Sequence, residues 1–368
     1  MVIERVIISG GGTGGHIFPA IAIADEIKKR NPAAKILFVG AKGKMEMEKV
    51  PQAGYKIEGL EIAGFQRKFK LSNFVLPIKI ARSLLKARRI IKKFKPDIVI
   101  GVGGYASGPT LKMAHMLRIP TVIQEQNSFP GKTNRILAAK TDCICTAYEG
   151  MEKFFPKTRI VLTGNPVRKE LNGAVISDRD AALKFFNLQP EIPTVLVIGG
   201  SLGAKTLNRS MLKGIEQFQS NGVQLLWQCG KNYYEKLLDE MVVRDKNNIH
   251  LHQFISRMDY AYQVADVIIS RAGAISVSEL SIVGKPVILV PSPNVSDDHQ
   301  TKNAMALTAK NAAILIKDDD ARDDLVDEVL KLIKDKDRCD QLSKEIKKLE
   351  KPNAVSEIVD VCENILDE

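Results

Sequence analysis

The sequence predicts an α/β protein made of two Rossmann-like domains, each a doubly wound parallel sheet, facing each other across a cleft. A glycine-rich loop follows an apolar strand-like run at Val6–His16, and a second one does so at Val195–Ala204. Strand and helix patterns alternate around both loops, which is typical of a parallel sheet covered by helices on both faces. The chain of 368 residues is also long enough for two domains of ordinary size.

In the first half, apolar runs predict strands and residues at helical spacing predict helices. The expected strands are 2–9, 35–40, 97–101, 121–124, 143–146 and 159–162, and the expected helices are 17–30, 44–53, 76–94, 108–117 and 134–140. The turn-rich stretch Gly164–Val167 predicts a break. We therefore expect an N-terminal domain at 1–165, a C-terminal domain at 166–345, and a final helix within 346–368 that could pack back on the first domain.

The second half of the chain repeats the alternation of predicted strands and helices. The expected strands are 194–199, 223–228, 249–254, 267–270 and 287–290, and the expected helices are 207–218, 259–264, 274–283 and a charged tail from Asp327. Each glycine loop follows the carboxyl end of a strand, where ligands of such sheets bind. Backbone N–H groups at the start of the next helix attract phosphate.

The net charge of +11 is concentrated between Ile62 and Pro96, where every charged side chain is basic. Large apolar residues interleave with these charges, so we expect contact with an anionic membrane surface, mainly through residues 64–79. The alternative is an amphipathic core helix with a solvated basic side, which the apolar spacing in 76–94 favours. Nucleic acid is not expected as a partner, because no recognition module accompanies the charge.

The five cysteines fit neither a zinc site nor a disulfide framework, so we expect reduced thiols and a cytoplasmic protein. No apolar run is long enough for a transmembrane helix, and the amino terminus leads directly into a strand pattern, so we expect no cleaved leader.

Several side chains at these loops could carry chemistry. His16 follows the first glycines at a helix start, where backbone donors disfavour the imidazolium, so it could act as a general base. Alternatively, it only bonds to nearby backbone. The loop matches G-x-G-x-x-G, but no acid ends the strand at 35–40, which counts against NAD or FAD. We expect no cofactor.

Three further clusters also admit two interpretations. Gly103, Gly104 and Tyr105 could approach a ligand closely or pack against the first loop. The run Gln124–Asn127 suits a hydroxyl-rich ligand or a solvated turn. Asp297 and Asp298 suit helix caps better than a metal site, and we interpret Asp178–Asp180 and Asp318–Asp320 as surface charge.

In the second half, Ser201 is placed to donate to a phosphate. The small residues before Glu279 leave the helix start at Ala274 open to a pyrophosphate. Glu279 lies where a carboxylate could accept both hydroxyls of a ribose.

Together these residues resemble the MurG family of N-acetylglucosaminyltransferases. The matching motifs are Gly11–His16, Gly103–Tyr105 with Ser107–Pro109, Glu125–Asn127, Gly164–Arg168, Gly199–Ser201 with Gly203–Ala204, Arg271–Glu279, and Gln300 with Asn303–Ala304. The resemblance implies the GT-B fold and inverting transfer of N-acetylglucosamine from UDP-N-acetylglucosamine to the C4 hydroxyl of lipid I, giving lipid II for peptidoglycan. It also implies a peripheral protein on the cytoplasmic face of the cell membrane, with other cell-wall enzymes as possible partners.

The resemblance also implies roles for individual residues. His16 is the leading base and Glu125 the second. The substrate-binding set is Thr13, Gly14, Gly15, Asn127, Arg168, Ser201, Ile255, Ala274, Ile275, Ser276, Val277, Ser278, Glu279 and Gln300, and the acceptor side holds Gly103, Gly104 and Tyr105. Many members have histidine where this chain has Gln124, and glutamine where it has Leu202, so those two side-chain roles do not apply.

Four other functions compete with this one. Two share the fold: a GT-B glycosyltransferase with a different acceptor, and a UDP-N-acetylglucosamine 2-epimerase, which would need no lipid-facing patch. The others are an NAD-dependent oxidoreductase, which the missing ribose acid opposes, and a non-catalytic nucleotide-binding module.

Overall fold

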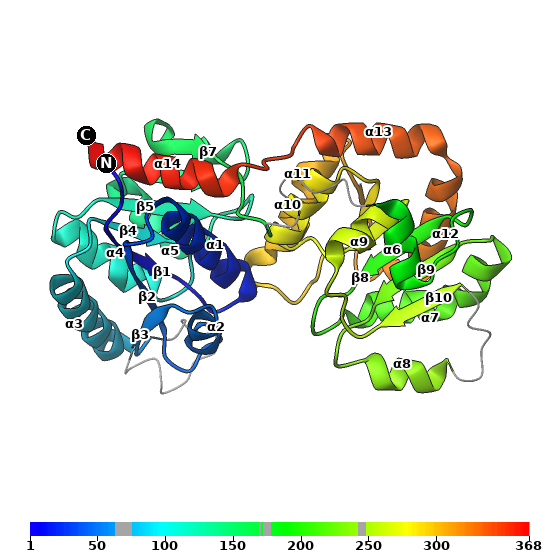
Figure 1. Cartoon of the computed structure of the whole chain (residues 1–368), viewed down its shortest axis with the longest axis horizontal. Coiled ribbons are helices and arrows are strands. Elements are labelled where there is room, and N and C mark those ends of the chain that lie inside the picture. Colours follow the sequence, from blue (N-terminus) through cyan, green and yellow to red (C-terminus); the bar gives the residue numbers. More distant parts are fainter. Residues whose placement is uncertain (63–75, 169–170, 172–177, 242–247, 368) are drawn as a thin grey trace. The chain divides into compact units, whose positions relative to one another are not determined.

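The computed structural model divides the chain into two compact units (Figure 1). It describes residues 1–62, 76–168, 171, 178–241 and 248–367. The first unit comprises residues 1–167 together with 353–368, and the second comprises residues 168–352.

The described residues of the first unit hold a seven-stranded parallel sheet in the order β3-β2-β1-β4-β5-β6-β7. Its strands are β1 Arg5–Ser9, β2 Lys35–Ala41, β3 Lys56–Leu60, β4 Ile98–Gly101, β5 Thr121–Glu125, β6 Cys143–Thr146 and β7 Ile160–Leu162, and its helices are α1 Gly14–Arg30, α2 Glu46–Gln52, α3 Leu76–Phe94, α4 Ser107–Met116, α5 Lys132–Leu137 and α14 Ala354–Asp367, with short 3₁₀ turns at Ala138–Lys140, Met151–Lys153 and Lys157–Arg159. The strand order reverses between β1 and β4. The glycine loops after these two strands therefore lie at the switch point, where open α/β sheets bind ligands.

The described residues of the second unit hold a six-stranded parallel sheet in the order β10-β9-β8-β11-β12-β13. Its strands are β8 Thr194–Ile198, β9 Gln224–Gln228, β10 Ile249–His252, β11 Val267–Ser270, β12 Val287–Leu289 and β13 Ile314–Leu315, and its helices are α6 Arg179–Phe186, α7 Lys205–Ser220, α8 Tyr234–Glu240, α9 Met258–Val264, α10 Ala274–Val283, α11 His299–Thr308, α12 Ala321–Lys334 and α13 Lys336–Lys347, with a 3₁₀ turn at Ser296–Asp298. The order reverses between β8 and β11, so the second glycine loop and the start of α10 occupy this sheet's switch point.

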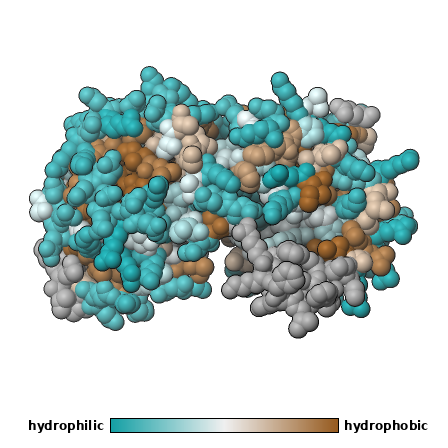
Figure 2. All heavy atoms as spheres, turned by 180° about the vertical axis from the view of Figure 1, so that it is seen from behind, coloured by the Kyte–Doolittle hydropathy of each residue, from teal (hydrophilic) through white to brown (hydrophobic). Residues whose placement is uncertain are grey.

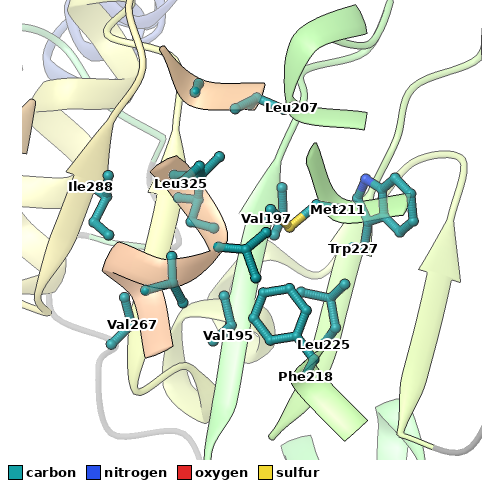
Figure 3. Packing of buried hydrophobic residues seen from close by; sticks show 14 of the residues in the cluster. Val195, Val197, Leu207, Met211, Phe218, Leu225, Trp227, Val267, Ile288 and Leu325 are labelled. Carbon is teal, nitrogen blue, oxygen red and sulfur yellow. The ribbon is translucent and has the colours of Figure 1, made fainter. Parts of the chain in front are cut away.

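Each sheet is buried because its strands are nearly continuous apolar runs that helices cover. Figure 3 shows the core of the second unit, where Val195 and Val197 of β8 gather with Phe218 of α7 and Leu225 of β9. In the first unit, α14 packs on α1, where Ile358, Val359 and Cys362 are buried. Arg30 of α1 fixes that contact with ion pairs to Asp360 at 2.6 Å and Glu363 at 2.8 Å.

Two strands absent from the sequence prediction, β3 and β13, each lie at the edge of their sheet. β3 carries charged residues and a glycine within its five positions, and β13 has two residues, so neither forms an apolar run. Helix α6 begins at a predicted surface cluster, where Asp178 caps it by accepting from the N–H groups of Asp180 and Ala181.

The expected membrane contact, residues 64–79, lies largely outside the described residues: 63–75 are not described, nor are the side chains of 76–78. Within α3, Ala87 and Ile91 are buried as the core-helix interpretation expects, whereas Ile80 is 40% exposed. No helix within the described ranges is both long and apolar enough to cross a bilayer. On the face shown in Figure 2, polar residues cover most of the surface and hydrophobic residues show in patches between them.

Candidate functional site

The two glycine loops of the first unit interlock. The Gly11 N–H donates to the Gly103 carbonyl at 3.3 Å. Gly104 has φ +87°, and a Cβ added there would lie 2.4 Å from the Gly11 carbonyl oxygen. Only glycine permits this approach, so the expected packing of the second loop against the first is present. Tyr105, the next residue, is 51% exposed.

His16 lies in the first turn of α1, directly after Gly14 and Gly15. Its Nδ1 is 3.0 Å from the Gly11 carbonyl oxygen and 3.1 Å from Thr13 Oγ1. Because a carbonyl only accepts, Nδ1 carries the proton, and the lone pair of the neutral ring lies on Nε2. The ring therefore bonds to nearby backbone and also presents a basic nitrogen.

Glu46, the first residue of α2, contacts this loop and was not among the residues predicted for the site. It is 1% exposed. Its Oε2 accepts from the Gly12 N–H at 2.8 Å and its Oε1 from the Ala41 N–H at 2.9 Å. The first glycine loop thus gives one of its donors to a carboxylate of the same chain rather than to a phosphate. In the sequence, Glu46 is one of two acids, with Glu48, a few residues past a strand end, and nothing in that pattern connects it to the glycine loop before it.

Glu125 ends β5 and is 2% exposed. Its Oε1 accepts from the backbone and side-chain nitrogens of Asn127, and its Oε2 from the Gly131 N–H at 3.2 Å and Asn134 Nδ2 at 2.8 Å. Burial raises the pKa of Glu125, although these hydrogen bonds oppose the shift. The carboxylate therefore organises the loop that carries Asn127.

The neighbours of Glu125 correct the idea of a solvated turn. Gln124 and Gln126 are buried, and Gln124 Nε2 donates to Asn165 Oδ1 at 2.8 Å. Gln126 Nε2 donates to the Val102 carbonyl at 2.9 Å. Both amides thus serve to hold loops together, and Asn127 is the half-buried member of the four.

In the second unit, the glycine loop after β8 packs tightly before α7. Gly203 has φ +89°, and a Cβ there would lie 2.2 Å from the Cys229 carbonyl oxygen. Ser201 is exposed at the tip of this loop. The start of α10 lies beyond the adjacent strand β11: Ala274, Ile275, Ser276 and Ser278 are half-buried there, and Val277 is buried. Ser201 and the α10 start are therefore at the ends of neighbouring strands.

Glu279 lies farther along α10, with its side chain 6% exposed. Arg168 Nε donates to Glu279 Oε1 at 2.6 Å, and the Tyr262 hydroxyl donates to Oε2 at 3.2 Å. Burial and the nearby carboxylate hold the pKa of Tyr262 well above its usual range. The tyrosine therefore remains a donor to Glu279.

Asp318 is not surface charge. It pairs with Arg271 Nη1, which also donates to the Val290 carbonyl at 3.0 Å, and it accepts from Thr206 Oγ1 at 2.8 Å. These bonds tie the loops after β11, β12 and β13 to the start of α7.

Two more predicted residues lie at strand ends of the same sheet. Ile255 is buried, and its N–H donates to Gln228 Oε1 at 2.9 Å. Gln300 lies in the first turn of α11, and its Oε1 accepts from the Ser292 N–H at 2.9 Å. Asp298 directly precedes α11 but caps it with no side-chain hydrogen bond. No group of His, Cys, Asp or Glu that could hold a metal ion occurs among the residues that the structure describes.

Two parallel-sheet units with glycine loops at their switch points are the fold of GT-B glycosyltransferases. Residues 6–146 match the glycosyltransferase family 28 N-terminal domain, and residues 194–358 match the glycosyltransferase family 28 C-terminal domain. The chain is 54% identical over 363 residues to the UDP-N-acetylglucosamine–N-acetylmuramyl-(pentapeptide) pyrophosphoryl-undecaprenol N-acetylglucosamine transferase of Parabacteroides distasonis, covering 99% of this chain and 98% of the relative.

Among solved structures, the chain is similar to MurG of Acinetobacter baumannii, with a TM-score of 0.80 and 28% identity over 98% of this chain and 99% of the other. It also shares its fold with a UDP-GlcNAc 2-epimerase from Neisseria meningitidis, with a TM-score of 0.66 and 15% identity over 98% of this chain and 100% of the other. The chain belongs to the MurG family of glycosyltransferases, within glycosyltransferase family 28.

Proposed function

We propose that this chain transfers N-acetylglucosamine from UDP-N-acetylglucosamine to the C4 hydroxyl of the N-acetylmuramyl-pentapeptide on pyrophosphoryl-undecaprenol, forming lipid II. The observation that carries the proposal is the full-length match, at 54% identity, to a relative named for this donor and acceptor. The 2-epimerase shares the fold alone, at 15% identity.

Residues of the second unit would hold the nucleotide. Each carboxylate oxygen has a second lone pair, so Glu279 can accept ribose hydroxyls while Arg168 and Tyr262 keep it oriented. Ser201 and the N-terminus of α10 would stabilise the charge that gathers on the departing diphosphate. The Ile255 N–H is bonded to Gln228, so we assign its carbonyl to the imide N–H of uracil.

Gln300 and Asn127 remain candidates for contacts to the diphosphate and sugar, together with the loop Thr13–Gly15. Gly103, Gly104 and Tyr105 remain candidates for the acceptor side. For Arg168, the hydrogen bond to Glu279 supports a role in orienting the Glu279 carboxylate, which would bind the ribose.

The transfer is a single displacement. The acceptor oxygen attacks the anomeric carbon, the bond from that carbon to the UDP oxygen breaks, and the hydroxyl proton passes to His16 Nε2. Glu125 is a weaker candidate base because its two oxygens already accept four hydrogen bonds in a buried loop. We therefore assign proton removal to His16.

The lipid acceptor places the enzyme at a membrane surface. We propose peripheral association with the cytoplasmic face through the basic and apolar residues 64–79, which the charge of the sequence supports.

The deciding experiment incubates the protein with radiolabelled UDP-N-acetylglucosamine and a lipid I analogue, with and without added Mg²⁺. Label in the extracted lipid product is the expected result. Conversion of the donor to its 2-epimer without acceptor, and no labelled lipid, would contradict the proposal.

A further inference from the structure

One peptide group of the first glycine loop is held at both ends. The carbonyl oxygen of Gly11 accepts from His16 Nδ1 at 3.0 Å. The N–H of the same peptide group, that of Gly12, donates to Glu46 Oε2 at 2.8 Å. A single planar amide therefore separates a carboxylate from an imidazole.

The surroundings of Glu46 leave room for its carboxylate and hold it still. A Cβ at Gly11 would lie 2.2 Å from Glu46 Cδ, and a Cβ at Gly40 would lie 2.5 Å from Glu46 Cγ. The second oxygen accepts from the Ala41 N–H, which anchors the side chain to the end of β2. Burial to 1% exposure removes competition from water, so these hydrogen bonds are stronger than they would be in water.

We propose that Glu46 is a positioning residue that acts on His16 through the Gly11–Gly12 peptide group. A carboxylate at the amide N–H polarises the amide and makes its carbonyl a better acceptor. That carbonyl holds the proton on Nδ1 and so keeps the basic lone pair on Nε2. In serine hydrolases, a carboxylate that is hydrogen-bonded directly to the histidine holds the proton on Nδ1. Here the effect of the carboxylate reaches the histidine through the peptide group. The proposal rests on the proposed role of His16 as the base.

The test compares Glu46→Gln with Glu48→Gln. Glu48 lies on the same helix but is exposed, so its variant controls for loss of a charge on α2. The glutamine amide nitrogen cannot accept from an N–H, so Glu46→Gln loses one of the two backbone bonds. We expect kcat to fall about 10- to 100-fold, with the KM for UDP-N-acetylglucosamine and the affinity for UDP unchanged, and no change in Glu48→Gln.

A second readout is independent of turnover. In ¹⁵N-histidine-labelled protein, with the His16 signals assigned by their loss in His16→Gln, the neutral ring is expected to be protonated at Nδ1. In Glu46→Gln it should shift toward the Nε2-protonated tautomer. An Nε2-protonated ring in the unmodified protein would overturn the proposal, even if the variant failed to fold. So would an unchanged tautomer and kcat in a folded Glu46→Gln.

These measurements separate this proposal from the one it rests on. If His16→Ala keeps full kcat, the assignment of His16 as the base fails. A tautomer shift in Glu46→Gln would then show only a structural link between Glu46 and His16. If no labelled lipid forms with the unmodified protein, the proposed transfer fails, and the spectra still decide whether Glu46 sets the tautomer.

Discussion

Arg168 Nε donates a 2.6 Å hydrogen bond to Glu279 Oε1, although the two residues are 111 positions apart in the sequence. The Tyr262 hydroxyl donates to the other oxygen of the same carboxylate. The arginine side chain is 42% exposed, whereas that of Glu279 is 6% exposed. A carboxylate held from two sides in this way is oriented before any ligand arrives, which reduces the ordering cost of binding.

Glu279→Gln should weaken nucleotide binding. An amide nitrogen cannot accept from Arg168, Tyr262 or a ribose hydroxyl, and a hydrogen bond to a charged group contributes about 1.5–3 kcal/mol. We expect UDP affinity, measured by titration calorimetry, to fall about 10- to 100-fold. Glu235→Gln, at an exposed position on α8, should bind UDP as the unmodified protein does. Equal UDP affinities for both variants would remove Glu279 from the nucleotide site.

His16→Ala should impair turnover rather than donor binding. Removing a positioned base costs about 10²- to 10⁴-fold in rate, and the contacts proposed for the uracil and the ribose come from the second unit. Steady-state kinetics with a lipid I analogue should show this fall in kcat, with the donor KM little changed. A variant with normal kcat would leave the reaction without its proposed base.

Gly104→Ala should destabilise the first unit. The added Cβ would lie 2.4 Å from the Gly11 carbonyl oxygen, a backbone atom, and φ is +87°. Backbone strain of this kind costs about 1–3 kcal/mol, which should lower the melting temperature in calorimetry. Gly131→Ala is the matched control, because a Cβ there meets nothing within 4 Å and its φ is −63°. Similar melting temperatures for both variants would show that the loops can separate without cost.

Charge reversal of Lys68, Lys70 and Lys79 to glutamate should weaken binding to anionic liposomes. Each basic residue near such a surface contributes about 1 kcal/mol, and the loss should be larger at low ionic strength, where screening is weaker. The control reverses Lys184, Lys336 and Lys344, which are exposed in the second unit and change the net charge equally. If both triple variants sediment with liposomes alike, the segment is not the membrane contact.

The order of the main strands and helices followed from the sequence, because buried parallel strands are apolar runs and the helices between them have a different period. That order is confirmed from β1 to β12, apart from β3, α6, α8 and α11. β3 escaped prediction because the pairing of its backbone with β2, rather than an apolar pattern, makes it a strand. The glycine loops were also visible, since positive φ at Gly12 or Gly203 needs that residue type.

The partners of the polar side chains were decided by the tertiary structure alone. Asp318 was predicted to be surface charge and Glu46 was not singled out in the sequence, yet the fold places each among donors from distant segments. A strand or helix period is a local property, set by neighbouring residues along the chain. A hydrogen bond between Gly12 and Glu46, or between Arg168 and Glu279, joins segments that are remote in the sequence, and those segments meet only when the core of each unit packs.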